Sequence, residues 1–265
     1  MNTPTKKTEI STSSGHYYAG QNSPMGPPGT PVYTVPKKDG SGPRNTTIAD
    51  ARKLNLVPSV TTVCKILDKP ALAIWLQNQA ITSALKLTRE PDEDEATFRS
   101  RILADSKELG REAADRGTAC HGAIERYIQG QSVDPEWMPH VQSTETALKA
   151  IGIDLMSGTA ERSFSHPDGF GGKIDLCGAD WIVDFKTKAD LKDDTKKLAW
   201  DEHLLQLASY SYGLGQPPRS RLINVFIGVD DAKAVCVEHD PDEAVTALAK
   251  FKLVLAYFKL DRKLP

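Results

Sequence analysis

The sequence contains no long apolar run, and no stretch approaches the roughly 20 consecutive apolar residues that a membrane-spanning helix needs. The first 14 residues include two lysines but no apolar core, so they do not resemble a secretory signal. We therefore expect no contact with a membrane and a cytoplasmic location. A hydrophobic content of 39% with 26% charged residues is typical of a globular domain.

Cysteine is scarce, and the four copies lie far apart with no Cys-x-x-Cys pair. We interpret them as reduced, mostly buried thiols, which argues against a zinc or iron–sulfur site. The net charge of −2 argues against a generally basic surface of the kind that coats nucleic acid. A local positive groove remains compatible with it, because phosphate binding depends on where the charges lie.

No internal repeat divides the chain, and its composition favours one domain preceded by an arm. Residues 1–45 begin with a stretch rich in Ser, Thr, Gly and Pro, and they are expected to be irregular or flexible. Residues 46–265 are expected to form a single mixed α/β domain, with a helical front over 46–155 and an α/β core over 156–265. Within the front, Gly117 is expected to divide the helical pattern into two helices.

Two strand-like runs, 171–178 and 181–187, are separated by Ala179 and Asp180, which predicts a two-residue hairpin turn. In that register Asp175 lies opposite Asp184, and like charges in facing positions destabilise a strand pair. A bound cation would offset this repulsion.

Side chains alternate along a strand, so Asp184 and Lys186 are expected to share one face of the hairpin. Apolar side chains are expected to face the opposite way, namely Ile174, Leu176, Val183 and Phe185. Taken alone, Asp-x-Lys is more typical of an ordinary amphipathic strand that ends in a surface ion pair.

Two helical segments carry further polar pairs spaced one turn apart. His121 and Glu125 lie at an expected helix start, and Gln206 and Tyr210 lie on a helix after the hairpin. Each pair alone is also compatible with an ordinary helix surface. Glu161, at the start of the preceding strand, is a further candidate for an acidic contact.

Together these motifs resemble the PD-(D/E)XK nuclease superfamily, most closely its RecB-like exonuclease branch. The segments 50–53 and 59–63 also resemble the front of exonucleases carried by phages. The resemblance covers roughly residues 115–230 and implies a restriction-endonuclease-like core, in which helices flank a central mixed β-sheet. Asp184 replaces the glutamate of many members, which the family's pattern allows. No clustered cysteines match the iron–sulfur cluster of some relatives, so none is expected here. The matching motifs are Gly117-Thr118 with His121 and Glu125, Gly172-x-x-Asp175, Asp184-x-Lys186, and Gln206-x-x-x-Tyr210.

The resemblance also implies roles for these residues. Lys186 would orient the attacking water or offset charge in the transition state. One or two Mg²⁺ or Mn²⁺ ions would be held by His121, Asp175, Asp184 and the backbone carbonyl of Phe185. The catalytic set would be Asp175, Asp184, Lys186 and His121, supported by Glu125, Gln206, Tyr210 and Glu161. Contacts with the DNA backbone would fall to Lys188, Lys192, Lys196 and Lys197.

The activity implied by the resemblance is that of a metal-dependent DNA exonuclease in phage or bacterial recombination, repair or DNA processing. Its location would be the cytoplasm of a bacterial cell or a phage-infected host. The expected partners are DNA and a single-strand annealing or single-strand-binding protein. Two alternatives stay open: a structure-specific or restriction-like endonuclease, and a non-catalytic nucleic-acid-binding module on the same fold.

Overall fold

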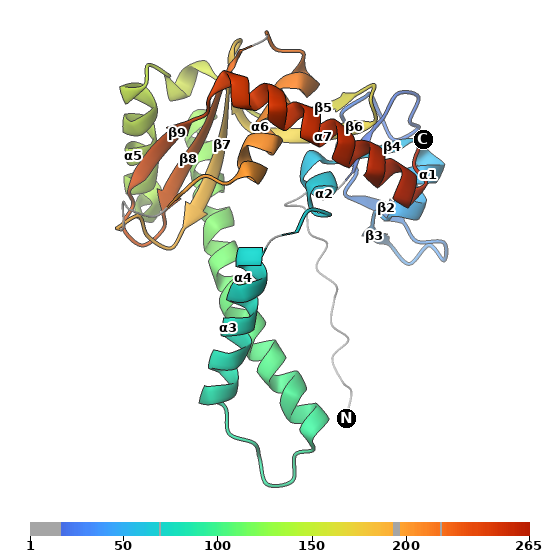
Figure 1. Ribbon diagram of the computed structural model, residues 1–265, viewed down its shortest axis with the longest axis vertical. Coiled ribbons are helices and arrows are strands. Elements are labelled where there is room, and N and C mark those ends of the chain that lie inside the picture. The colour runs from blue at the N-terminus through green and yellow to red at the C-terminus, as the bar shows by residue number, and fades with distance from the viewer. Residues whose placement is uncertain (1–16, 69, 193–196, 218) are drawn as a thin grey trace.

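A five-stranded sheet forms the centre of the computed structural model, which describes residues 17–68, 70–192, 197–217 and 219–265 (Figure 1). Strands β7 and β8 run parallel, and the other neighbouring pairs are antiparallel. The parallel pair is connected through helix α6 (Asp201–Leu214). The strand order across the sheet is β5 (Thr159–His166), β6 (Phe170–Cys177), β7 (Trp181–Lys188), β8 (Arg221–Gly228) and β9 (Ala234–Glu238).

Helices cover both faces of this sheet. One face packs against α2 (Val60–Cys64), α6 and α7 (Pro241–Arg262), in a core that includes the fully buried Phe251. The other face packs against α4 (Glu95–Ile128) and α5 (Met138–Ala150), in a core that includes Ile223. These layers confirm the expected mixed α/β class and the mixed sheet flanked by helices.

The segment before the sheet differs from the expected irregular arm. Residues 17–45 hold three short strands, and the side chains of Tyr17, Val32 and Val35 are buried in a third core. Residues 1–16 lie outside the described residues. Two small antiparallel pairs build this region, β1 (Tyr17–Ala19) with β4 (Leu56–Pro58) and β2 (Thr34–Pro36) with β3 (Pro43–Asn45), beside α1 (Ile48–Leu54).

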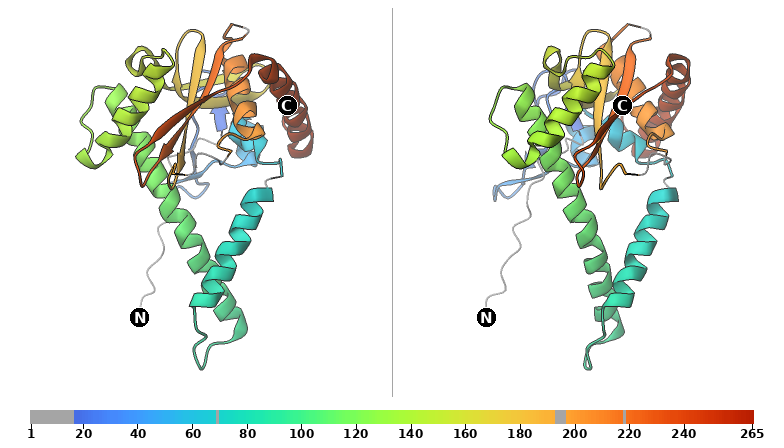
Figure 2. Two further views of the ribbon diagram at one scale, coloured as in Figure 1. Left: turned by 60° about the vertical axis from the view of Figure 1, so that its left-hand side comes forward. Right: turned by 90° about the vertical axis from the view of Figure 1, so that its left-hand side faces the viewer.

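The helical front contains a long hairpin of α3 (Pro70–Lys86) and the first half of α4, which projects away from the sheet (Figures 1 and 2). The expected break at Gly117 is wrong, because α4 continues through it. Gly117 instead allows a close approach, since a Cβ there would lie 2.6 Å from Thr187 Oγ1 on β7. Two short 3₁₀ helices flank α5, η1 (Pro135–Trp137) and η2 (Leu155–Ser157).

Across the described part of the chain, none of the helices combines the length and the apolar character that crossing a membrane requires.

Candidate functional site

The hairpin between β6 and β7 has the two-residue turn that the sequence predicts. The Gly178 amide donates to the Trp181 carbonyl at 3.0 Å, and Leu176 pairs with Val183. Beyond this pair the strands separate, and the Asp175 carboxylate replaces the backbone ladder by accepting from the Phe185 amide at 2.8 Å. Asp175 is therefore fixed to β7 next to Asp184.

The alternation of side chains holds on β7 but not along all of β6. Val183 and Phe185 pack in the core beneath α4 and α5, as expected. Ile174 and Leu176, expected to share a face, pack in different cores. The alternation changes beside Glu161, whose backbone on the neighbouring strand has a φ of 56°, a left-handed conformation that interrupts the regular pleat.

Asp184 is the centre of a buried polar network. Its exposed fraction is 2%, and its two oxygens accept hydrogen bonds from three side chains. Lys186 Nζ lies 2.9 Å from Oδ1 and 2.7 Å from Oδ2. Gln206 Nε2 donates to Oδ1 at 2.9 Å, and Asn224 Nδ2 donates to Oδ2 at 2.8 Å. Strands β7 and β8 and helix α6 thus converge on one carboxylate.

The pKa values in this network reflect burial and charge together. Burial raises the pKa of Asp184, and the Lys186 ammonium opposes that rise. Burial acts to lower the pKa of Lys186, but the charges of Asp184 and Asp175 outweigh it and raise the pKa above its ordinary value. Because three donors point at the Asp184 oxygens, we assign the pair as a charged carboxylate and a charged ammonium.

Helix α6 presents its two predicted polar residues to this network. The Gln206 amide oxygen accepts from Lys186 Nζ at 3.2 Å, and its amide nitrogen also donates to Tyr210 Oη at 2.9 Å. The ring of Tyr210 lies against the backbone of β6, where a Cβ on Gly172 would come within 2.7 Å of Tyr210 Cε1. The glycine of the Gly-x-x-Asp motif therefore provides room for the tyrosine.

His121 and Glu125 lie on α4, and the structure places them differently. The His121 ring contacts Phe185 edge to face, with 6.0 Å between centroids, and a charge on His121 would lower the pKa of Asp184. Glu125 accepts from Gln129 Nε2 at 2.9 Å, and no hydrogen bond joins it to His121 among the described residues. The structure thus places the His121 ring against Phe185, and the predicted support from Glu125 is not formed among the described residues.

The remaining predicted residues lie around this network. Glu161 forms an ion pair with Lys173. The Lys188 ammonium lies over the Phe226 ring and that of Lys197 over the Trp200 ring, at 5.8 and 5.2 Å from the centroids. The side chain of Lys192 is exposed, and Lys196 lies outside the described residues.

The sequence did not single out Asn224 or its neighbour His239. Asn224 is fully buried, pairs with Asp184 in the β7–β8 register, and accepts a hydrogen bond through Oδ1 from His239 Nε2 at 2.8 Å. A lone amide in the apolar run Leu222 to Ile227 was the available signal. A buried polar residue in a central strand needs partners, and here one partner is Asp184.

Comparisons with known proteins assign no family. No family model matches the chain, and no curated protein does. Among solved structures, the chain is similar to SSO0001, known from its crystal structure. The two share 16% sequence identity over 71% of this chain and 88% of that one, with a TM-score of 0.31. That similarity is too low to support an argument about fold or function.

The donor types near Asp184 suit Mg²⁺ or Mn²⁺, which prefer carboxylate and carbonyl oxygens, with an imidazole acceptable to manganese. Asp175 Oδ1 has no hydrogen-bond partner among the described residues, so one carboxylate oxygen remains available. Both oxygens of Asp184 already accept hydrogen bonds. Across the described residues, no three His, Cys, Asp or Glu side chains are grouped closely enough to hold a metal ion. The donor atoms are of the types that bind a divalent ion. In this structure the Lys186 ammonium lies against both oxygens of Asp184.

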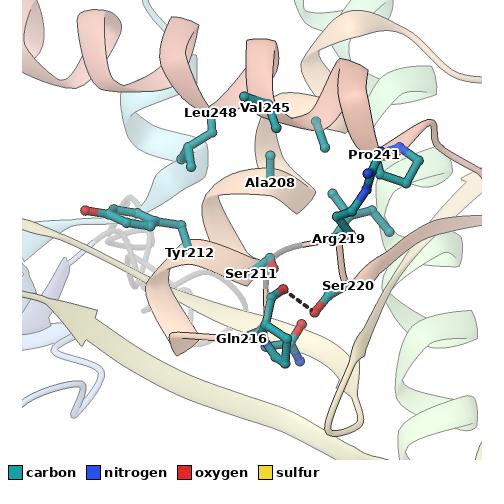
Figure 3. A pocket seen from close by; sticks show the side chains of 12 residues that line it. Ala208, Ser211, Tyr212, Gln216, Arg219, Ser220, Pro241, Val245 and Leu248 are labelled. Carbon is teal, nitrogen blue, oxygen red and sulfur yellow. Dashed lines mark hydrogen bonds between the residues drawn. The ribbon is translucent and has the colours of Figure 1, made fainter.

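A separate, largely apolar pocket lies between the end of α6 and the start of α7 (Figure 3). Tyr212, Gln216, Arg219 and Leu248 contribute to its lining, and none of the predicted site residues does. We therefore place the candidate site at Asp184 and not in this pocket.

Proposed function

We propose that the protein is a metal-dependent DNA exonuclease with a restriction-endonuclease-like core. The observation that carries this proposal is the network of Asp184, Lys186, Gln206 and Tyr210 beside Asp175. Two carboxylates and one ammonium gathered between two strands are suited to phosphodiester hydrolysis. The setting we propose, following the family resemblance, is phage or bacterial recombination, repair or DNA processing in the cytoplasm, with a single-strand annealing or single-strand-binding protein as partner.

Asp175, Asp184, His121 and the Phe185 carbonyl would hold the ion, which when bound lowers the pKa of water and polarises the phosphoryl oxygen. The protein's own residues would do the positioning. Lys186 carries a positive charge at neutral pH and can stabilise negative charge on the phosphate. Gln206 fixes the Lys186 ammonium through its amide oxygen.

Burial also keeps the Tyr210 hydroxyl protonated, because desolvation and the charges of Asp184 and Asp175 raise its pKa well above the ordinary value. Tyr210 therefore acts as a neutral hydrogen-bonding group in this proposal. Its bond with Gln206 holds the amide in the orientation that serves both Lys186 and Asp184.

The test uses end-labelled linear DNA and covalently closed circular DNA, each single- and double-stranded, with Mg²⁺, Mn²⁺ or a chelator. Metal-dependent degradation of linear DNA alone is the expected result. Cutting of circles would instead indicate an endonuclease. DNA binding without metal-dependent cleavage would refute both enzymatic functions and support the non-catalytic nucleic-acid-binding module.

Variants identify the site in the same assay. Asp184→Ala and Lys186→Ala should each reduce cleavage by at least about a hundredfold, as expected for loss of an electrostatic catalytic group. The matched controls are Asp180→Ala in the hairpin turn and Lys149→Ala on α5, which should cleave like the wild type. Normal cleavage by Asp184→Ala would refute the assignment of the site.

A further inference from the structure

Helix α6 carries a third polar residue on the side that meets the Asp184 network. His203, Gln206 and Tyr210 recur at intervals of three and four residues, which places them on one side of the helix. Gln206 and Tyr210 belong to the network, whereas His203 makes no hydrogen bond with any member of it. The helix rises by about 1.5 Å per residue, so His203 lies roughly 4.5 Å along its axis from Gln206.

Strand β7, against which α6 packs, has a matching row of polar side chains (Figure 1). Alternation along the strand places Asp184, Lys186 and Lys188 on one face, at steps of about 6.6 Å. Lys186 lies opposite Phe226 in the β7–β8 register, and the Phe226 side chain is fully buried. The centre of the His203 ring and the Lys188 ammonium lie 5.6 and 5.8 Å from the centroid of that phenyl ring. His203 and Lys188 therefore share one aromatic neighbour, one step along the strand from Lys186.

The tautomer of His203 is fixed at the start of α6. The Trp200 amide donates to His203 Nδ1 at 3.1 Å. Burial and the charge of Lys186 lower the pKa of His203 to about 4. The charges of Asp184 and Glu202 oppose this shift without cancelling it, so the ring is neutral at pH 7. A neutral ring whose Nδ1 accepts a hydrogen bond carries its proton on Nε2. His203 therefore presents one N–H donor.

This donor and the neighbouring ammonium both lack an acceptor. His203 Nε2 makes no hydrogen bond with any residue that the structure describes, and its side chain is only partly buried. The Lys188 ammonium forms no ion pair within the same part of the chain. A neutral N–H and an ammonium near each other match a ligand that accepts hydrogen bonds and carries negative charge. A phosphodiester is such a ligand.

We propose that His203 and Lys188 form a second phosphate subsite, in which the Nε2–H group and the ammonium hold the DNA phosphate next to the scissile one. This inference rests on the proposed function, since it takes Asp184 and Lys186 as the position of the scissile phosphate. The step of about 6.6 Å from Lys186 to Lys188 is of the same order as the spacing between successive phosphates of one DNA strand. A metal ion fits poorly here, because Nε2 carries a proton and an ammonium repels a cation.

The first test compares His203→Gln with His203→Glu in the full-length protein, by the binding of short labelled DNA with Ca²⁺. Both side chains can accept from the Trp200 amide, as Glu and Gln commonly do at this position of a helix, so both preserve the start of α6. Gln alone keeps an N–H donor. His203→Gln should bind DNA within about threefold of the wild type, and His203→Glu at least about tenfold more weakly. Equal affinities of the two variants would overturn the proposal, because a purely structural role is preserved in both.

The second test locates the phosphate. Methylphosphonate linkages, in which a methyl group replaces one charged oxygen, are placed singly at the scissile phosphate and at its two neighbours. At one neighbour, the substitution should weaken binding by the wild type at least about tenfold, and binding by the neutral variant His203→Leu about threefold or less. Lys188→Gln should show its coupling at the same position. Equal effects on wild type and His203→Leu at all three positions would overturn the proposal, as would coupling confined to the scissile phosphate.

Salt distinguishes the two donors. Lys188→Gln should reduce the slope of log affinity against log salt concentration by about 0.7–0.9, because it removes one cationic contact with a phosphate. His203→Gln should leave that slope unchanged, since the ring it replaces is neutral. An unchanged slope in Lys188→Gln would exclude Lys188 from the subsite and overturn the proposed pair.

Cleavage with Mg²⁺ separates failure of the subsite from failure of the proposed function. His203→Leu should raise KM at least about fivefold and change kcat less than about twofold, because the subsite binds DNA away from the reacting phosphate. The control His166→Leu, about 16 Å along the β5–β6 hairpin from Asp175, should cleave like the wild type. If the wild type cleaves DNA while His203→Leu and Lys188→Gln bind and cleave it equally well, the subsite is refuted and the nuclease stands. A wild type that neither binds nor cleaves DNA would refute both.

Discussion

Replacing Lys186 with methionine isolates the charge of the ammonium while keeping most of the side-chain volume. The variant leaves Asp184 buried with two neutral donors, Gln206 and Asn224, and without its counter-charge. Removing one member of a buried ion pair costs about 3–5 kcal/mol in the free energy of unfolding. Lys186 is partly exposed, at 27% of its side chain, and the two amides remain, so we expect a loss of about 2–3 kcal/mol at pH 7.

The stability that Lys186→Met loses should depend on pH in a defined direction. Without Lys186, burial and the charge of Asp175 raise the folded-state pKa of Asp184 further above the unfolded value of about 3.9. Below the unfolded pKa the carboxyl is protonated in both states, so the penalty disappears there. It grows as the pH rises through the folded-state pKa. The stability difference between wild type and Lys186→Met should therefore be larger at pH 7 than at pH 4.

Urea unfolding at several pH values measures this difference, with the double variant Asp184→Leu/Lys186→Met closing a mutant cycle. Removing both charges should cost less than the sum of the single variants, with a coupling of about 2 kcal/mol. Lys149→Met, at an exposed position on α5, should change stability by less than about 0.5 kcal/mol. Equal stability of Lys186→Met and wild type at pH 7, or an identical loss at both pH values, would refute the buried pair.

Three other changes test neighbouring parts of the site. Asn224→Leu removes a hydrogen bond to Asp184, so unfolding measurements should show a loss of about 1–3 kcal/mol; an unchanged midpoint would contradict that contact. Gly172→Ala forces its Cβ against Tyr210 and should cost about 1–3 kcal/mol and lower cleavage; wild-type stability and activity would contradict the predicted clash. Burial, with the charge of Lys186, lowers the pKa of His203 to about 4, so stability should fall between pH 6.5 and 4 by at most about 3 kcal/mol. The stability of His203→Gln should depend less on pH than that of the wild type, and identical pH profiles of stability would contradict the lowered pKa of His203.

The features that the sequence predicted are those governed by local periodicity. The two-residue turn and the shared face of Asp184 and Lys186 follow from alternation along one hairpin. Gln206 and Tyr210 are one helical turn apart and therefore reach the same network. Each of these inferences needs a single element or two adjacent ones, for which the pattern of side chains is sufficient.

The features that were missed depend on contacts between distant segments. Asn224 reaches Asp184 through the parallel pairing of β7 and β8, which no local pattern specifies. The helix continues through Gly117 because the tertiary approach to Thr187 outweighs the weak helix propensity of glycine. Residues 17–45 are ordered by packing against 48–56, although their composition alone resembles a flexible segment.

The charge balance of the site links the proposed metal to the proposed substrate. Asp175, Asp184 and Lys186 together carry a formal charge of −1, which repels a phosphodiester, and one divalent cation would change it to +1. Binding of DNA, and not only its cleavage, should therefore require a divalent ion. With Ca²⁺ in place of Mg²⁺, fluorescence anisotropy of a short labelled DNA should show at least about tenfold tighter binding than with a chelator. In the Asp175→Asn variant the formal charge of these three side chains is zero. With a chelator, this variant should bind DNA more tightly than the wild type does. Adding Ca²⁺ should increase its DNA affinity by less than it increases that of the wild type. Equal affinity of the wild type with and without the ion would contradict this electrostatic account.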